Sequence, residues 1–152
     1  MKELERHDRA VLQFSGGKDS LACLSLLQPW WEKITVLWAN TGDAFPETIE
    51  QMRRIRDAVP HFIEVRSDAT AHIADYGWPV DVVPTTNTAV GKMLDGHDRP
   101  LLQHYTSCCG TNIWRPLCAA AADLGATLVI RGQRLDEHSR SSLLSGEIVE
   151  GI

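Results

Sequence analysis

The sequence predicts an α/β fold in which helices cover both faces of a doubly wound, Rossmann-like parallel sheet. Short apolar runs alternate with amphipathic helical segments, which is typical of βαβ units. The run Ile34 to Ala39 is almost wholly apolar, as a strand buried on both faces requires. At 152 residues, the chain is long enough for a single domain with a hydrophobic core.

The first strand is expected at Val11 to Phe14, where an apolar run ends at a serine and two glycines. A helix follows, and Pro29 is expected to end it. Its expected inner face carries Leu21, Leu24 and Leu27, with Cys23 and Leu26 beside them.

The second strand is broken by Asn40-Thr41-Gly42. Pro46 then suits the first turn of a helix, and Glu47 is favoured there by the helix dipole. The apolar stripe of this helix is Ile49, Met52, Ile55 and Val59. A third strand is expected at His61 to Val65.

The rest of the chain is less uniform. Asp68 to Gly110 carries Pro79, Pro84 and Pro100 and is expected to be less regular and to wrap the edge of the fold. Pro116 to Leu124 predicts a helix closed by Gly125 as a C-cap. Thr127 to Ile130 predicts a fourth strand, and the polar run Arg131 to Arg140 follows it.

Composition narrows the function classes. A formal net charge of -5 argues against a general nucleic-acid binder. No apolar run approaches the roughly 20 residues of a membrane span, and the first ten residues are too charged for a signal peptide. We therefore expect a cytoplasmic protein with no membrane partner. A disulfide framework is not expected there for the four cysteines, Cys23, Cys108, Cys109 and Cys118.

The stretch Ser15 to Ser20 is the strongest functional signal. A turn between a strand and a helix can direct several backbone N–H groups at one anion. Gly16 and Gly17 allow close approach of the backbone to a ligand, Lys18 adds a positive charge, and the two serines add hydroxyls. Asp19 would repel a phosphate unless a metal ion or a backbone contact offsets its charge.

Two common nucleotide motifs do not fit this stretch. A Walker A loop needs G-x-x-x-x-G-K-[ST], but Leu12 stands at the first glycine position and Asp19 follows Lys18. The dinucleotide motif G-x-G-x-x-G fails because Gly16 and Gly17 are adjacent. A glycine turn without a ligand is the alternative interpretation.

Four segments in order resemble the phosphoadenylyl-sulfate (PAPS) reductase-like family of the PP-loop ATP pyrophosphatase (adenine nucleotide alpha hydrolase-like) superfamily, over residues 10 to 145. They are SGGKDS at 15–20, Asn40-Thr41-Gly42 with Phe45-Pro46-Glu47-Thr48, Cys108-Cys109 with Arg115-Pro116-Leu117, and Gly132-Gln133-Arg134 with Glu137 and Arg140. The chain departs from the family pattern at Asn40, which replaces an aspartate, and at His138, which replaces a serine.

The resemblance implies roles for these residues. The turn Ser15 to Ser20 would hold the pyrophosphate of ATP or the phosphosulfate of a sulfonucleotide. The end of the second strand, with Trp38, Asn40, Thr41 and Gly42, would hold the adenosine, although core packing explains Trp38 equally well. Arginine suits phosphate and sulfate, so Arg134 and Arg140, with Gln133, would contact the ligand unless they form only a solvated charge run. The implied catalytic residues are Lys18, Asp19 and Arg134.

Cys108 and Cys109 leave three interpretations open. By resemblance they are part of a [4Fe–4S] site, which needs four thiolates; Cys118 is one substitute for a missing ligand. A zinc site could add His104, although the spacing is unusual. Two thiols beneath a loop, without metal, is the third interpretation.

The resemblance implies a sulfonucleotide reductase domain, served by a thioredoxin-type reductant. One alternative is an AMP-forming ATP pyrophosphatase or nucleotidyltransferase that uses Mg²⁺ in sulfur metabolism or nucleic-acid sulfur modification. A non-catalytic nucleotide-binding module is another. The family's catalytic segment, similar to E-C-G-L-H, does not occur in the sequence, and we expect residues 1–152 to be one domain without the C-terminal segment of relatives.

Overall fold

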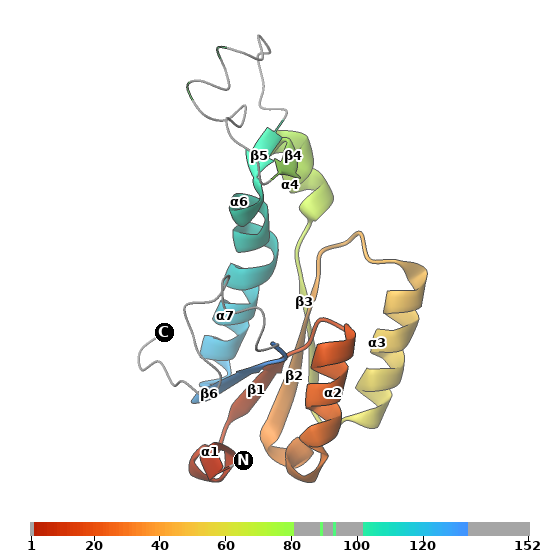
Figure 1. The fold of residues 1–152 in the computed structure, drawn as a ribbon, viewed down its shortest axis with the longest axis vertical. Helices are drawn as coiled ribbons and strands as arrows, with labels where there is room; N and C mark the ends of the chain where they lie inside the picture. The colour runs from red at the N-terminus through yellow and green to blue at the C-terminus, as the bar shows by residue number, and fades with distance from the viewer. Residues whose placement is uncertain (1, 81–88, 90–92, 94–101, 134–152) are drawn as a thin grey trace.

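The computed structural model describes residues 2–80, 89, 93 and 102–133 of the chain. Its centre is a four-stranded, all-parallel sheet in the order β3-β2-β1-β6 (Figure 1). The strands are β1 (Ala10–Gln13), β2 (Ile34–Asn40), β3 (Phe62–Arg66) and β6 (Leu128–Arg131). The predicted doubly wound α/β fold is confirmed, and each strand boundary lies within one residue of its predicted position.

The strand order creates a switch point beside β1. From β1 the chain passes outward to β2 and β3, and it then returns to place β6 on the other side of β1. Gln13 and Arg131 are paired at the carboxyl ends of β1 and β6. In open α/β sheets, ligands bind outside the strand ends at this point.

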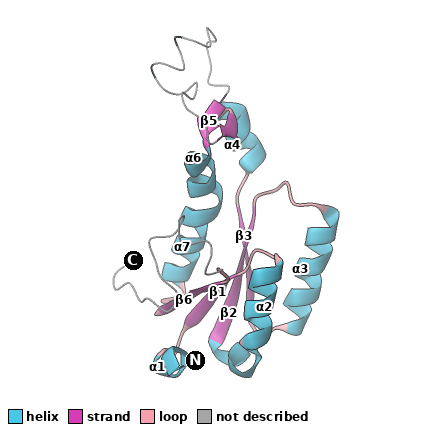
Figure 2. Ribbon diagram, viewed as in Figure 1, coloured by secondary structure: helices cyan, strands magenta, loops and turns pink. Residues whose placement is uncertain are grey.

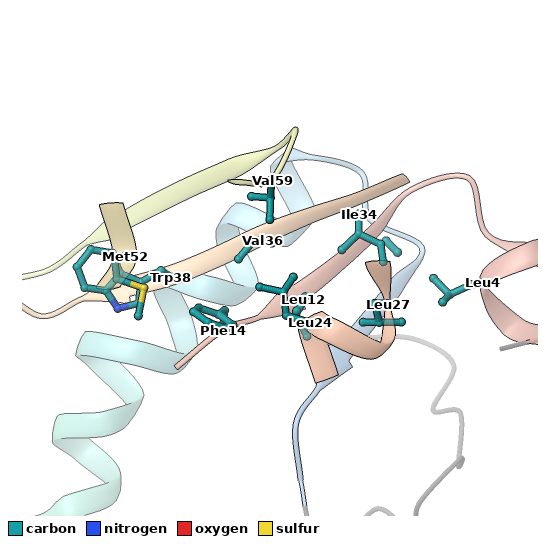
Figure 3. Packing of buried hydrophobic residues seen from close by; sticks show 11 residues of the cluster. Leu4, Leu12, Phe14, Leu24, Leu27, Ile34, Val36, Trp38, Met52 and Val59 are labelled. Carbon is teal, nitrogen blue, oxygen red and sulfur yellow. The ribbon is translucent and has the colours of Figure 1, made fainter. Parts of the chain in front are cut away.

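Helices cover both faces of the sheet (Figure 2). On one face lie α2 (Lys18–Leu26) and α3 (Pro46–Ala58), and on the other lies α7 (Arg115–Asp123). Because successive strand residues point to opposite faces, the strands contribute side chains to two hydrophobic cores, one on each face of the sheet. Figure 3 shows the larger one. It includes Leu12, Val36 and Trp38 from the strands, Phe14 just after β1, and Leu24 and Met52 from the helices. The smaller one contains Val11, Leu37, Leu117 and Ala121.

The inner face of α2 differs from the prediction. Leu24 and Leu27 are buried, but Leu21 and Leu26 are 40% and 75% exposed. The buried line instead begins at Ser20 and follows the i, i+4, i+7 spacing of one helix face. The predicted stop is confirmed, because α2 ends before Pro29, which lies in the first turn of the 3₁₀-helix η1 (Gln28–Lys33).

The expectation of irregular structure from 68 to 110 is wrong for the described part. That part contains α4 (Ala69–Tyr76), a parallel pair β4 (Trp78–Val80) and β5 (Leu102–His104), and α6 (Tyr105–Cys109). The carboxylate of Asp68 accepts a hydrogen bond from the amide of Ala71 at 2.8 Å and caps the N-terminus of α4. Pro79 is tolerated because β4, in the described part of the chain, pairs on one side only, with β5.

The short helix α6 continues through a π-helical turn, η2 (Gly110–Trp114), directly into α7. The Ser67 hydroxyl donates to the Asn112 carbonyl at 2.8 Å, which satisfies an acceptor in the π-helical turn. Gly125 ends α7 with φ of 59° and a Schellman pair of hydrogen bonds, so the predicted cap is confirmed. The first helix in the described part of the chain is α1 (Lys2–Arg6). Within the described ranges, no helix is long and apolar enough to cross a bilayer.

Candidate functional site

The turn between β1 and α2 leaves backbone donors available to a ligand. Gly16 has φ of 79°, a conformation that disfavours any residue with a Cβ. Gly17 is the N-cap of α2, without a side-chain cap, and its carbonyl accepts the first helical bond, from Leu21 N at 3.0 Å. The amides of Lys18, Asp19 and Ser20 therefore have no intrahelical acceptor. Together with the helix dipole, they form an anion-binding N-terminus.

The hydroxyls of Ser15 and Ser20 brace this turn. Ser20 Oγ donates to Gly17 O at 2.9 Å and lies 3.1 Å from Ser15 Oγ. Because a hydroxyl has one proton, Ser15 donates to Ser20, and Ser15 Oγ accepts from Gly17 N at 3.3 Å. These bonds form a closed ring. The sequence suggested the serines as ligand donors, but the structure places both in the support of the turn.

Two residues of α3, Gln51 and Met52, lie against Gly16 of the turn. Gln51 Nε2 donates to Gly16 O at 3.2 Å. A Cβ built on Gly16 would lie 2.5 Å from Cε of the buried Met52. The sequence placed Met52 on an inward helical stripe, but it gave no signal for the Gln51 contact, which depends on how α3 packs beside α2.

The loop after β6 lies directly against the turn. A Cβ built on Gly132 would lie 2.8 Å from both Cα and N of Ser20 and 2.9 Å from Asp19 C. The segments 15–20 and 132–133, far apart in the sequence, are thus neighbours at the switch point, and Gln133 is exposed beside it. Arg134, Glu137, His138 and Arg140 lie outside the described residues.

The two charged residues of the turn are accessible. Lys18 is exposed and Asp19 is half-buried. Neither forms an ion pair within the described part of the chain. Their charges are therefore available to a ligand or a metal ion.

The turn after β2 is held by its own hydrogen bonds. Asn40 Oδ1 accepts from Gly42 N at 3.0 Å, and Gly42 has φ of 89°. The Thr41 hydroxyl donates to the Asp43 carboxylate, and its carbonyl accepts from Ala69 N at 3.0 Å. Asn40, Thr41 and Gly42 thus form one ordered turn at the carboxyl edge, as the sequence predicted from the end of the strand.

Glu64 lies beneath this turn and was not predicted as part of the site. A hydrogen bond from Asn40, the largest cause, and then one from Arg66 lower the pKa of Glu64 to about 2, with a further contribution from Arg56. The carboxylate is therefore ionised across the ordinary pH range. The available signal in the sequence was a glutamate among the apolar residues Phe62, Ile63 and Val65 of the third strand.

Trp38 belongs to the core. Its side chain is 5% exposed and packs with Met52 (Figure 3). Of the two interpretations left open by the sequence, the structure supports core packing for this side chain.

The described cysteines do not make a cluster site. Cys108 is buried, and its backbone carbonyl accepts from Asn112 Nδ2 at 3.1 Å. Burial, and then the neighbouring Cys108, raise the pKa of the half-buried Cys109. Across residues 2–80 and 102–133, His, Cys, Asp and Glu side chains form no group of three that could hold a metal ion. Cys118 is exposed one helix further on. Two thiols fall short of the four that a [4Fe–4S] cluster needs, so no chemistry is assigned to a cluster here.

The parallel sheet with helices on both faces defines a Rossmann-like α/β protein. A helix N-terminus without a side-chain cap lies at its switch point, which is a position that favours anions. The model of the phosphoadenosine phosphosulfate reductase domain matches residues 9–147, so the chain belongs to that family, within the PP-loop superfamily. Members of the family act on adenine nucleotides, typically with thioredoxin as reductant. No curated protein matches the chain.

Proposed function

We propose that the chain is the nucleotide-binding domain of a sulfonucleotide reductase, which takes phosphoadenylyl sulfate or adenylyl sulfate. One observation carries this proposal: the uncapped amides of Lys18 to Ser20 lie at the switch point of the sheet. Family membership supports an adenine nucleotide as the ligand.

In this proposal the ligand lies across the carboxyl edge of the sheet. The amides of the turn and the Lys18 ammonium bind the oxygens of the phosphosulfate, while the Asn40–Gly42 turn lies against the adenosine. Gln133 lines the neighbouring loop. Arg134 and Arg140 follow Gly132, whose backbone lies against Ser20, and we assign them to phosphate or sulfate contacts.

The reaction proposed is thiol attack on sulfur. A thiolate forms a bond to the sulfur of the sulfonucleotide, the sulfur–oxygen bond to phosphate breaks, and the nucleotide leaves with the electron pair. A thioredoxin-type thiol then attacks the sulfur of the first thiol, which leaves a disulfide and releases sulfite. The amides of the turn and Lys18 stabilise the charge that develops on the departing phosphate. No described cysteine is assigned as the nucleophile.

Cleavage of Mg²⁺-bound ATP is a second candidate, favoured by Asp19. This carboxylate lies in the turn with no ion-pair partner in the described part of the chain. A bridging Mg²⁺ would offset its repulsion of a phosphate.

Calorimetric titration of the chain with phosphoadenylyl sulfate, adenylyl sulfate and Mg-ATP tests both candidates. We expect a sulfonucleotide to bind most tightly, and Lys18→Ala to weaken that binding by about tenfold, as expected when a charged contact is lost. Lys33→Ala is the matched control, because Lys33 precedes β2 at the opposite edge of the sheet. Tighter binding of Mg-ATP would favour the second candidate. Equal affinity of the wild type and Lys18→Ala would contradict the assignment of the turn.

A further inference from the structure

Glu64 and Asn40 form a matched pair across two neighbouring strands. Asn40 ends β2, and Glu64 lies on β3 opposite Trp38, two residues before Asn40. Asn40 Nδ2 donates to Glu64 Oε1 at 2.7 Å, while Asn40 Oδ1 accepts from Gly42 N at 3.0 Å. The amide of Asn40 therefore connects Glu64 to the backbone of the Asn40–Gly42 turn.

Two arginines fix the carboxylate of Glu64. Arg56 Nη2, from α3, donates to Oε2 at 2.8 Å, and Arg66 Nε, from β3, donates to Oε1 at 3.0 Å. The Arg56 guanidinium lies 5.1 Å from the centroid of the Phe62 ring. With its side chain only 14% exposed, Glu64 is held from three elements of the fold and can serve as a rigid acceptor.

This arrangement requires an amide at position 40. An aspartate there would place a second carboxylate 2.7 Å from Glu64 Oε1, where like charges disfavour the ionised forms. Asparagine supplies both the donor for Glu64 and the acceptor for Gly42. Asn40, which replaces the aspartate of the family's D-T-G segment, is thus the side chain that can donate a hydrogen bond to Glu64.

We propose that Glu64 is a positioning residue of the nucleotide site, which fixes, through the Asn40 side chain, the turn that receives the nucleoside part of the ligand. The inference rests on the proposed function. The backbone of the turn is also tied to the loop after β3, since Asn40 O accepts from Ser67 N and Thr41 O from Ala69 N, both at 3.0 Å. Glu64 acts on Gly42 only through Asn40, whose Oδ1 accepts from Gly42 N at 3.0 Å. This bond restrains a glycine whose positive φ would otherwise leave it adaptable.

The test measures the binding of two probes, adenylyl sulfate and inorganic pyrophosphate, to variants at positions 40 and 64. We call residues 15–20 the phosphate turn and residues 40–42 the nucleoside turn. In the proposal, adenylyl sulfate contacts both turns, whereas inorganic pyrophosphate contacts the phosphate turn alone. We expect Asn40→Asp to weaken the binding of adenylyl sulfate by about tenfold, which is the effect of one lost hydrogen bond to a charged group. The affinity for pyrophosphate should stay within about twofold of the wild-type value. Glu64→Gln is expected to act in the same direction.

The double variant Asn40→Asp/Glu64→Gln exchanges donor and acceptor between the two side chains. It is expected to recover part of the lost affinity, because Arg66 Nε, which donates to Glu64 Oε1, would then face an amide N–H. Glu50→Gln is the matched control, because Glu50 pairs with two arginines, Arg53 and Arg54, without touching the turn. Equal loss of both probes, unchanged adenylyl sulfate binding in both single variants, or failure of the double variant to recover would overturn the inference while leaving the proposed function intact. A wild-type chain that binds no adenine nucleotide would overturn both.

Discussion

Gly132→Ala directly tests the contact between the loop after β6 and the phosphate turn. The new methyl group would lie 2.8 Å from Cα and N of Ser20, whereas ordinary contact begins at 3.4 Å. These are backbone atoms, which cannot rotate away, so the two segments must separate by about 0.6 Å or the chain must strain. Gly132 does not have a positive φ, so the effect comes from this contact alone.

The expected size follows from the geometry. Overpacking of a well-packed site costs about 1–3 kcal/mol of unfolding free energy. A shift of Ser20 N by about 0.6 Å lengthens an ordinary 2.9 Å bond to a ligand oxygen beyond hydrogen-bond range. Loss of one bond to a charged group costs roughly 1.5–3 kcal/mol, or tenfold and more in affinity.

The assay is urea unfolding together with calorimetric titration of adenylyl sulfate, and Gly110→Ala is the control. A Cβ at Gly110 meets no atom within 4 Å, and Gly110 has helical φ of -58°. Alanine there should stabilise the chain by about 0.5–1 kcal/mol with unchanged affinity. If Gly132→Ala is as stable as the wild type and binds as tightly, the packing of the loop after β6 against the turn is refuted.

Three further predictions concern stability. Gly16→Ala should cost about 1–2 kcal/mol, chiefly because a left-handed alanine is strained. Its Cβ would also meet Met52 Cε, the end of a flexible side chain, so the contact adds less. In a double-mutant cycle by urea unfolding, Met52→Leu should relieve part of the cost, and strict additivity would contradict the contact. The pKa of Glu64 is lowered from 4.5 to about 2, so its stabilisation is complete above pH 4.5 and is lost as the pH falls towards 2. Because Arg66 is exposed, this contribution is roughly 2 kcal/mol, and Glu64→Gln should flatten the unfolding free energy over that pH range; an unchanged slope would count against the ion pairs. Leu26→Gln should change the free energy of unfolding by less than about 0.5 kcal/mol, since Leu26 is 75% exposed. A loss above about 2 kcal/mol would contradict the exposed position of this side chain.

The phosphate turn could be read from sequence because its chemistry is local. A strand, two glycines, a lysine and a helix start are contiguous, and the conformation of such a turn depends on its own residues. Gly125 was predictable for the same reason, since a glycine after a helix favours the left-handed cap. The helix α4 was not predicted, because the prolines of the segment 68–110 argued for irregular structure and the N-cap at Asp68 was not recognised.

The burial pattern of α2 and the support of the site could not be read in the same way. Leu21 and Ser20 differ by one position, and only the packing of α2 on the sheet decided that the serine faces inward and the leucine outward. The contacts of Gln51 with Gly16 and of Glu64 with Asn40 join residues that are 35 and 24 positions apart.

The sequence by itself thus determined the strand–helix alternation, the glycine turn at 15–20 and the family, because each is carried by short-range patterns of burial and backbone freedom. The tertiary structure alone decided that Trp38 packs in the core, that Ser15 and Ser20 brace the turn, and that Glu64 lies beneath Asn40. The physical reason is that parallel strands meet side by side only after helices have crossed between them, so contacts between their carboxyl ends depend on register and packing.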